Sequence, residues 1–289
     1  MGGFASPLRY PGGKQRLTPL ITELLVENGL VGGTYVEPYA GGAGVAIRLL
    51  QEGLVRRVYL NDSSYNVFAF WHVLASEPEG LCRRIERASL SVPEWRKQRE
   101  ILRNPNEHDV MQVAFSTLYL NRCNRSGVLS GGVIGGLQQT GKWKMDARFS
   151  RRELIRRVEA IAQFSDRIRA TNMDAEHFLS QKVSRLGNRT LVYLDPPYFE
   201  KSSRLYLDTY SSQDHVRLAS SIQDRLKKNW IVSYDAVPQI MKLYRKRRRF
   251  LYDLNYSAAT VSTGREVMFF GDSVRLPRSI TAQPFKVTA

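Results

Sequence analysis

Short apolar stretches that end at an acidic residue recur along this chain, and they constrain its fold more than any other feature. Residues 190–195 (TLVYLD) are five mostly apolar, β-prone residues followed by an aspartate, and residues 56–62 (RRVYLND) end in the same way. Further strands are predicted at residues 34–39, at 167–173 with Asp174 just past the end, and at 229–235 and 265–270. Helical patterns separate most of these strands, and strands that alternate with helices predict an α/β fold with a doubly wound sheet.

Acidic residues mark the carboxyl ends of four of the predicted strands. They are Glu37, Asp62, Asp174 and Asp195, and a glycine turn (Gly41–Gly44) follows the first of them. A single aspartate after a strand is most often a helix cap. Doubly wound sheets, however, bind ligands at the carboxyl ends of their strands. Four acids in equivalent places therefore predict one shared crevice.

A long stretch between residues 76 and 164 breaks the alternation. It contains no clear strand pattern, it has helical patterns at 92–104 and 107–122, and residues 124–149 are rich in glycine and cations and predict a hairpin or an adaptable loop. Ninety residues are far more than a crossover between strands needs. We therefore predict an inserted, mainly helical domain at 76–164, and a main domain formed by 1–75 and 165–289.

The charge of the chain points to a polyanionic partner. Lys and Arg number 43 against 27 Asp and Glu, which gives a formal net charge of +16. Such an excess favours DNA, RNA or an anionic membrane. No apolar run approaches the ~18 residues of a membrane span, so no membrane partner is expected. Two cysteines and four scattered histidines give neither a disulfide framework nor a zinc site, and we expect a cytoplasmic protein without a metal.

Two common nucleotide-binding motifs are absent. A phosphate-binding loop around Lys14 would need glycine in place of Leu8 and serine or threonine in place of Gln15. A dinucleotide fingerprint beginning at Gly42 and Gly44 would need a glycine at Ile47. Neither ATP hydrolysis nor NAD chemistry is therefore predicted.

The order of the remaining motifs resembles a known family. RYPGGK near the start, VEPYAGGAGVA after it and DPPY at residues 195–198 make the chain similar to the Dam-like DNA adenine methyltransferases. The resemblance covers nearly the whole chain, including YLNRCNRSG, YSSQDHVRLA, NWIVSYD and GREVMFF. It implies a Rossmann-like methyltransferase sheet with S-adenosylmethionine as cofactor. It also implies that the inserted domain at 76–164 recognises duplex DNA.

The resemblance assigns the catalytic step to the DPPY motif. The exocyclic amino group of adenine is a poor nucleophile because its lone pair is delocalised into the ring. Asp195 and the backbone carbonyl of Pro196 would each accept a hydrogen bond from this amino group, and Pro197 would stiffen the backbone. Tyr198 would stack on a base flipped out of the duplex.

The cofactor positions carry over residue by residue from the resemblance, whereas the DNA positions are chosen by charge and by residue types that contact bases or phosphates. The cofactor positions are Tyr10, Lys14, Glu37, Pro38, Ala40, Gly41, Gly42, Asp62, Asp174 and Asp195. The DNA positions are Arg122, Asn124, Arg125, Lys142, Lys144, Arg247 and Arg248. Arg247 and Arg248 belong to a basic run that we expect beside the catalytic crevice. The residues after NRSG differ from those of the GATC-reading members, so recognition of GATC is not predicted.

The expected activity is transfer of a methyl group to adenine in duplex DNA, by a monomer in a bacterium or a phage-infected cell. Two alternatives remain open from the sequence. The same chemistry could act on cytosine or on RNA, although related cytosine enzymes usually carry serine in place of Asp195. A catalytically idle DNA-binding protein of this fold is the other alternative, and the intact Lys14, Asp62 and DPPY motif argue against it.

Overall fold

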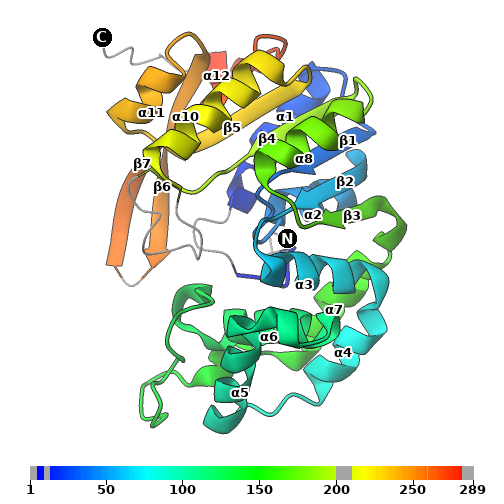
Figure 1. The fold of residues 1–289 in the computed structure, drawn as a ribbon, viewed down its shortest axis with the longest axis vertical. Helices are drawn as coiled ribbons and strands as arrows, with labels where there is room; N and C mark the ends of the chain where they lie inside the picture. Colours follow the sequence, from blue (N-terminus) through cyan, green and yellow to red (C-terminus); the bar gives the residue numbers. More distant parts are fainter. Residues whose placement is uncertain (1–4, 10–13, 200–209, 259, 282–289) are drawn as a thin grey trace.

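The framework of the protein is a seven-stranded sheet with the strand order β3-β2-β1-β4-β5-β7-β6 (Figure 1). The computed structural model describes residues 5–9, 14–199, 210–258 and 260–281. The strands are β1 (Gly33–Glu37), β2 (Val55–Asn61), β3 (Ile168–Thr171), β4 (Thr190–Leu194), β5 (Asn229–Asp235), β6 (Arg248–Ala258) and β7 (Thr260–Phe270). Strands β1 to β5 are parallel, and β7 runs antiparallel to both β5 and β6. The predicted α/β sheet is confirmed.

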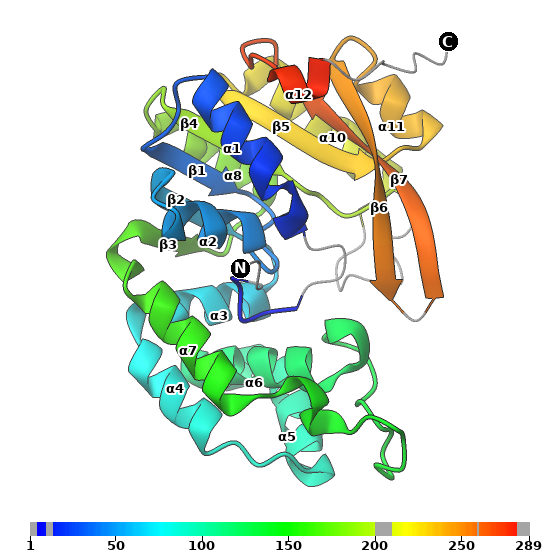
Figure 2. The same cartoon turned by 180° about the vertical axis from the view of Figure 1, so that it is seen from behind.

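Helices cover both faces of this sheet (Figures 1 and 2). One face carries α1 (Thr18–Glu27), α2 (Gly44–Gln51), α3 (Tyr65–Ser76) and α12 (Arg278–Thr281). The other face carries α8 (Ala175–Gln181), α10 (Ser212–Ser220) and α11 (Pro238–Leu243).

The side chains of β4 explain why this strand needs a helix layer on each side. Leu191 and Tyr193 belong to the hydrophobic cluster on the α1 face, whereas Val192 and Leu194 belong to the cluster on the α8 face. All four are at most 2% exposed. Because successive strand residues point to opposite faces, a strand that is apolar at every position is buried on both sides.

A helical block connects β2 to β3. It continues from α3 through α4 (Pro78–Glu86), α5 (Val92–Arg103), α6 (Val110–Cys123) and α7 (Arg151–Ala162). Residues 62–167 are described throughout and contain no strand, only one isolated antiparallel bridge between Asn124 and Val133. In both views the block lies below the sheet, next to its β3 edge.

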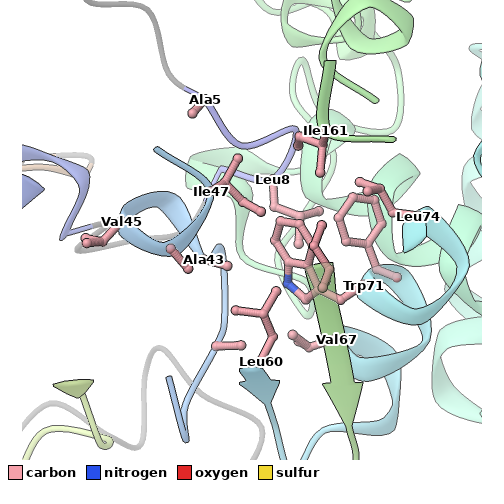
Figure 3. Packing of buried hydrophobic residues seen from close by; sticks show 14 of the residues in the cluster. Ala5, Leu8, Ala43, Val45, Ile47, Leu60, Val67, Trp71, Leu74 and Ile161 are labelled. Atoms are coloured by element: carbon pink, nitrogen blue, oxygen red, sulfur yellow. The ribbon is translucent and has the colours of Figure 1, made fainter. Parts of the chain in front are cut away.

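The helical block shares a hydrophobic core with the sheet. Trp71 of α3 lies among Leu60 at the end of β2, Leu74 of its own helix and Ile161 of α7 (Figure 3). Its indole is 1% exposed. Helix α3 thus packs on both the sheet and the rest of the helical block. Because α3 begins at Tyr65, the helical region starts before residue 76. The division into a domain at 76–164 with its own role in DNA recognition stays a prediction.

Strand β6 was not predicted from the sequence. Its first residues belong to the basic run at 245–249, and the charges conceal the alternating pattern that follows. Within the described ranges, no helix is long and apolar enough to cross a membrane. The same residues contain no group of three or more His, Cys, Asp or Glu side chains arranged to hold a metal ion.

Candidate active site

The candidate site lies where the strand order of the sheet reverses, between β1 and β4. The chain proceeds outward from β1 to β2 and β3, and then returns to β4 on the other side of β1. Such a switch point leaves a crevice outside the carboxyl ends of the two strands. Glu37 ends β1, Asp195 directly follows β4, and Asp62 directly follows β2. Three of the four predicted acids thus follow adjacent parallel strands at one edge.

The glycine turn after β1 is tightly bent. Gly41 has φ 42°, and Ala43 is left-handed with φ 44° and ψ 32° at the N-cap of α2. A left-handed conformation normally favours glycine, so this turn holds a strained alanine. The carbonyl oxygen of Gly41 accepts a 2.9 Å hydrogen bond from Trp71 Nε1. Helix α3 therefore stabilises the turn through this hydrogen bond.

Asp62 connects this turn to the end of β2. Its Oδ2 accepts a hydrogen bond from the Gly41 amide at 2.9 Å, and its Oδ1 accepts one from the Ser64 amide at 3.0 Å. The neighbouring Asn61 donates to the carbonyl oxygens of Pro38 and Met173 at 3.0 and 2.9 Å. These bonds hold the ends of β1, β2 and β3 together.

Glu37 is buried beneath the turn, with 5% of its surface exposed. Its Oε1 accepts a 3.2 Å hydrogen bond from the amide of Ala46 in the first turn of α2. Burial raises the pKa of the Glu37 carboxyl to about 8, although the bond from Ala46 acts in the opposite direction. Glu37 thus holds a proton at neutral pH.

A buried network surrounds Lys14. Its ammonium nitrogen lies 2.8 Å from Glu266 Oε2, 2.8 Å from the Tyr198 hydroxyl and 3.3 Å from Asp195 Oδ1. Tyr252 donates a further 2.7 Å hydrogen bond to Glu266 Oε2. Burial alone would lower the pKa of Lys14, but the two carboxylates outweigh it and raise the pKa. Lys14 is therefore a fixed cation beside Asp195.

Asp195 is held from two sides. Besides Lys14, Ser233 donates a 2.8 Å hydrogen bond to Asp195 Oδ1, and the Ser233 hydroxyl also bonds Tyr193 at 2.9 Å. Burial and the negative charge of Glu266 raise the pKa of Asp195, whereas Lys14 and Ser233 lower it. A quarter of the Asp195 side chain stays exposed. The carboxylate is thus accessible and has a fixed orientation.

The rest of the DPPY motif lies against the same network. Pro196 and Tyr198 are buried, Pro197 is partly exposed, and Tyr198 is 2% exposed with its hydroxyl bonded to Lys14 and Glu266. The following amide, that of Phe199, donates to Asp235 Oδ1 at 3.0 Å. The motif is therefore anchored at both ends, to Ser233 and to Asp235 of β5.

Of the other cofactor positions, three lie in the turn after β1, one caps a helix and one is outside the described residues. Pro38, Ala40 and Gly42 belong to the turn after β1, and the Ala40 amide donates to Asn61 O at 2.8 Å. Asp174 caps helix α8 by accepting a 3.0 Å bond from the His177 amide, three residues beyond the end of β3. Tyr10 lies outside the described residues.

Two of the residues expected to read DNA bases are buried in the helical block. Arg122 is 7% exposed and donates to the carbonyl oxygen of Pro7, and burial lowers its pKa to about 9. Asn124 is fully buried, accepts a 2.7 Å bond from Trp95 Nε1 and donates to the carbonyls of Val128 and Leu129. Here the structure differs from the expectation, because both side chains are occupied in holding the fold.

Three other cations of the block are exposed. Arg125 lines a hollow with several arginines of α5, and Lys142 and Lys144 lie on either side of Trp143, which is 66% exposed. The loop at 124–148 that carries them lies on the same side of the molecule as the far ends of β6 and β7 (Figures 1 and 2).

Arg247 and Arg248 are not beside the crevice, which corrects the expectation from the sequence. Arg248 begins β6 and pairs with Phe270, whereas Glu266 of the network pairs with Asp235. Phe270 lies four positions after Glu266, which is about 13 Å along the strand. Arg247 bonds Gln223 and Asp272, and Arg248 bonds three backbone carbonyls. Because β7 runs antiparallel to β5, both arginines lie at the edge formed by the amino ends of the parallel strands, opposite the crevice.

Sequence reasoning missed Glu266, Ser233 and Tyr252. Ser233 and Glu266 lie in stretches that were interpreted only as strands. Tyr252 follows the basic run, in the unpredicted strand β6. An acid directly before the apolar stretch 267–270 was the signal that could have identified Glu266, because a buried carboxylate needs a partner.

Comparison with known proteins gives one family. The model of D12 class N6 adenine-specific DNA methyltransferases matches residues 10–260. This range includes Lys14, the glycine turn, Asp62 and the DPPY motif. Among curated proteins, no sequence matches the chain.

Proposed function

The chain belongs to the family of D12 class N6 adenine-specific DNA methyltransferases, and from this premise we propose how it works. It transfers the methyl group of S-adenosylmethionine to the N6 amino group of an adenine that is flipped out of duplex DNA. The single observation that carries this proposal is the position of Asp195, an oriented, accessible carboxylate at the switch point of the sheet.

Asp195 and the carbonyl oxygen of Pro196 each accept a hydrogen bond from the amino group of the target adenine. These two hydrogen bonds favour a pyramidal nitrogen, whose lone pair is then directed at the methyl group of the cofactor. Ser233 and Lys14 hold the carboxylate in place before the base arrives, so no reorganisation is needed during the reaction. Burial raises the pKa of Asp195, and the charge of Lys14 acts against this by lowering it.

The cofactor pocket is formed by the turn after β1 and the end of β2. When bound, the cofactor supplies an electrophilic methyl group. Asp62 suits the ribose hydroxyls, because a carboxylate accepts several hydrogen bonds at once and two backbone amides already orient this one. Gly41 and Gly42 allow a ligand to approach the backbone closely. Asp174 and Phe178 would lie toward the adenine ring, and neutral Glu37 supports the turn from below.

Tyr198 would contact the flipped base with its ring. The ring is 2% exposed, so stacking requires a local rearrangement around the DPPY motif. Flipping a base costs a few kcal/mol, and contact with an aromatic ring offsets part of that cost.

The helical block would contact the duplex through the exposed cations of the segment after α6. Arg125, Lys142 and Lys144 are the members of the expected set that are accessible there. Arg122 and Asn124 would act indirectly by holding the segment after α6 in shape.

Incubation with labelled cofactor and DNA duplexes of varied sequence, with RNA in a parallel reaction, followed by digestion to nucleosides, tests the proposal. N6-methyladenine is the expected product, and the modified adenines in genomic DNA would then give the recognition site. Label in methylcytosine, or label only on RNA, would overturn it. An Asp195→Ala chain prepared in parallel excludes a contaminating enzyme.

A further inference from the structure

The loops at the amino ends of the parallel strands form a second basic surface, remote from the candidate active site. They are residues 182–189 before β4, 224–228 before β5, 242–248 before β6 and 271–278 after β7. We call this surface the amino edge. Because Asp195 follows the carboxyl end of β4, the whole length of the strand separates it from the amino edge.

The amino edge is far more basic than the chain as a whole. Its four segments contain thirteen Lys and Arg but only two acids, Asp224 and Asp272, whereas the chain has 43 Lys and Arg against 27 acids. Six of its cations are exposed and, among the described residues, form no ion pair. They are Lys182, Arg185, Arg225, Lys242, Arg245 and Lys246.

Hydrogen bonds between the loops make the amino edge one continuous surface. Lys228 donates to the carbonyl oxygen of Leu186, which joins the loops before β5 and β4. Arg247 bonds Gln223, directly before the loop that leads to β5, and Asp272 in the segment after β7. These two bonds join the loop before β6 to both neighbours. In Figures 1 and 2 these loops gather along the top of the molecule, and the helical block lies at the bottom.

We propose that the amino edge binds a second segment of duplex DNA while the active site holds the first. The edge of the four adjacent strands β4, β5, β7 and β6 is about 14 Å wide. Duplex DNA carries one negative charge per ~1.7 Å of its axis, so about eight phosphate charges would cross that width. Crowded cations that lack acidic partners repel one another, and a polyanion relieves this repulsion.

Spaced cations suit a phosphate backbone and carry no sequence preference. The second segment would therefore keep the enzyme on DNA between methylation events. This inference goes beyond the proposed function, because it involves neither Asp195 nor the cofactor pocket.

The test compares two variants of the full chain, each lacking four cations. The edge variant carries Lys182→Gln, Arg185→Gln, Arg245→Gln and Lys246→Gln. The control variant carries Arg83→Gln, Arg84→Gln, Arg87→Gln and Arg152→Gln, which removes the same charge from exposed positions on α4, directly after α4 and in the first turn of α7. The probe is a short fluorescent duplex with one adenine target, titrated between about 50 and 200 mM salt.

Wild-type and control chains should bind two duplexes at low salt, the second more weakly. The edge variant should lose at least about tenfold in affinity for the second duplex, with a salt slope reduced by roughly 0.9 per lost contact. Its single-turnover methylation of the short duplex should be unchanged. Equal losses in both variants, a single duplex bound by the wild type, or an amino edge that retains anionic lipid vesicles but no DNA would overturn the inference. Loss of methylation in the wild type would instead count against the proposed function, whatever the stoichiometry.

Discussion

Lys14 Nζ lies 2.8 Å from Glu266 Oε2, although 252 positions separate the two residues in the sequence. The pair joins the segment before α1 to strand β7 and places a cation 3.3 Å from Asp195. Glu266 is fully buried, and Lys14 is 7% exposed. Removing one partner of such a pair leaves an uncompensated charge, at a cost of about 3–5 kcal/mol. The network is therefore a structural anchor as well as a support for Asp195.

Glu266→Gln should shift the pH dependence of methyl transfer. Burial and the charge of Glu266 both raise the pKa of Asp195, so the amide should lower that pKa. Because transfer needs ionised Asp195, activity falls as the pH drops through this pKa. The acidic limb of kcat/KM against pH should therefore move to lower pH in the variant.

The control for this measurement is Tyr252→Phe. It removes one hydrogen bond to Glu266 and leaves both carboxylates in place. Its acidic limb should stay close to that of the wild type. A limb that does not move in Glu266→Gln, or moves to higher pH, would contradict the coupling between the two carboxylates.

Glu37→Gln should flatten the pH dependence of stability. Burial raises the pKa of Glu37 from 4.5 to about 8, so the folded chain keeps a proton that the unfolded chain releases. The stability from this group is fully present below pH 4.5 and is lost as the pH rises through about 8. The loss is at most about 1.4 kcal/mol per pH unit within that window.

Urea unfolding at several pH values between 5 and 8 gives the comparison, since one proton per chain should account for the difference in slope between wild type and variant. Glu27→Gln, at an exposed position in α1, is the matched control. Parallel stability curves for wild type and Glu37→Gln would show that Glu37 is ionised in the folded chain.

Asp62→Ala should weaken binding of S-adenosylmethionine. A hydrogen bond to a charged group contributes typically about 1.5–3 kcal/mol, and the change also frees the Gly41 amide. Binding of duplex DNA without cofactor should change little. Calorimetry with Asp62→Asn, which keeps one acceptor, should give an intermediate affinity. Cofactor affinity equal to that of the wild type in both variants would remove Asp62 from the pocket.

The sequence was informative where a structural feature depends on a single strand. Residues 191–194 are all hydrophobic, as expected for a strand covered on both faces, and the acid that follows them could be placed at the carboxyl edge. The resemblance to a family then supplied the chemistry of the DPPY motif. Lys14, Asp62 and Asp195 are all found at that edge.

The sequence was uninformative where the position of a residue depends on which strands or segments are neighbours in the fold. The basic run could be placed beside the crevice or opposite it, and only the antiparallel course of β7 decides between them. The burial of Arg122 likewise depends on Pro7, 115 positions away. Long-range partners of this kind leave no local pattern, which is also why Glu266 was missed.

Single-turnover methyl transfer by Asp195→Asn tests the central claim most directly. The substitution keeps the shape of the side chain and an oxygen that can accept the bond from Ser233, but it removes the charge beside Lys14. Binding of duplex DNA and of S-adenosylmethionine should be retained, and Ser233→Ala serves as a milder control that loosens the carboxylate without neutralising it. At saturating DNA and cofactor, we predict a rate about 100–1000-fold below that of the wild type. A rate near that of the wild type would contradict the role of Asp195 as the acceptor that activates the adenine amino group.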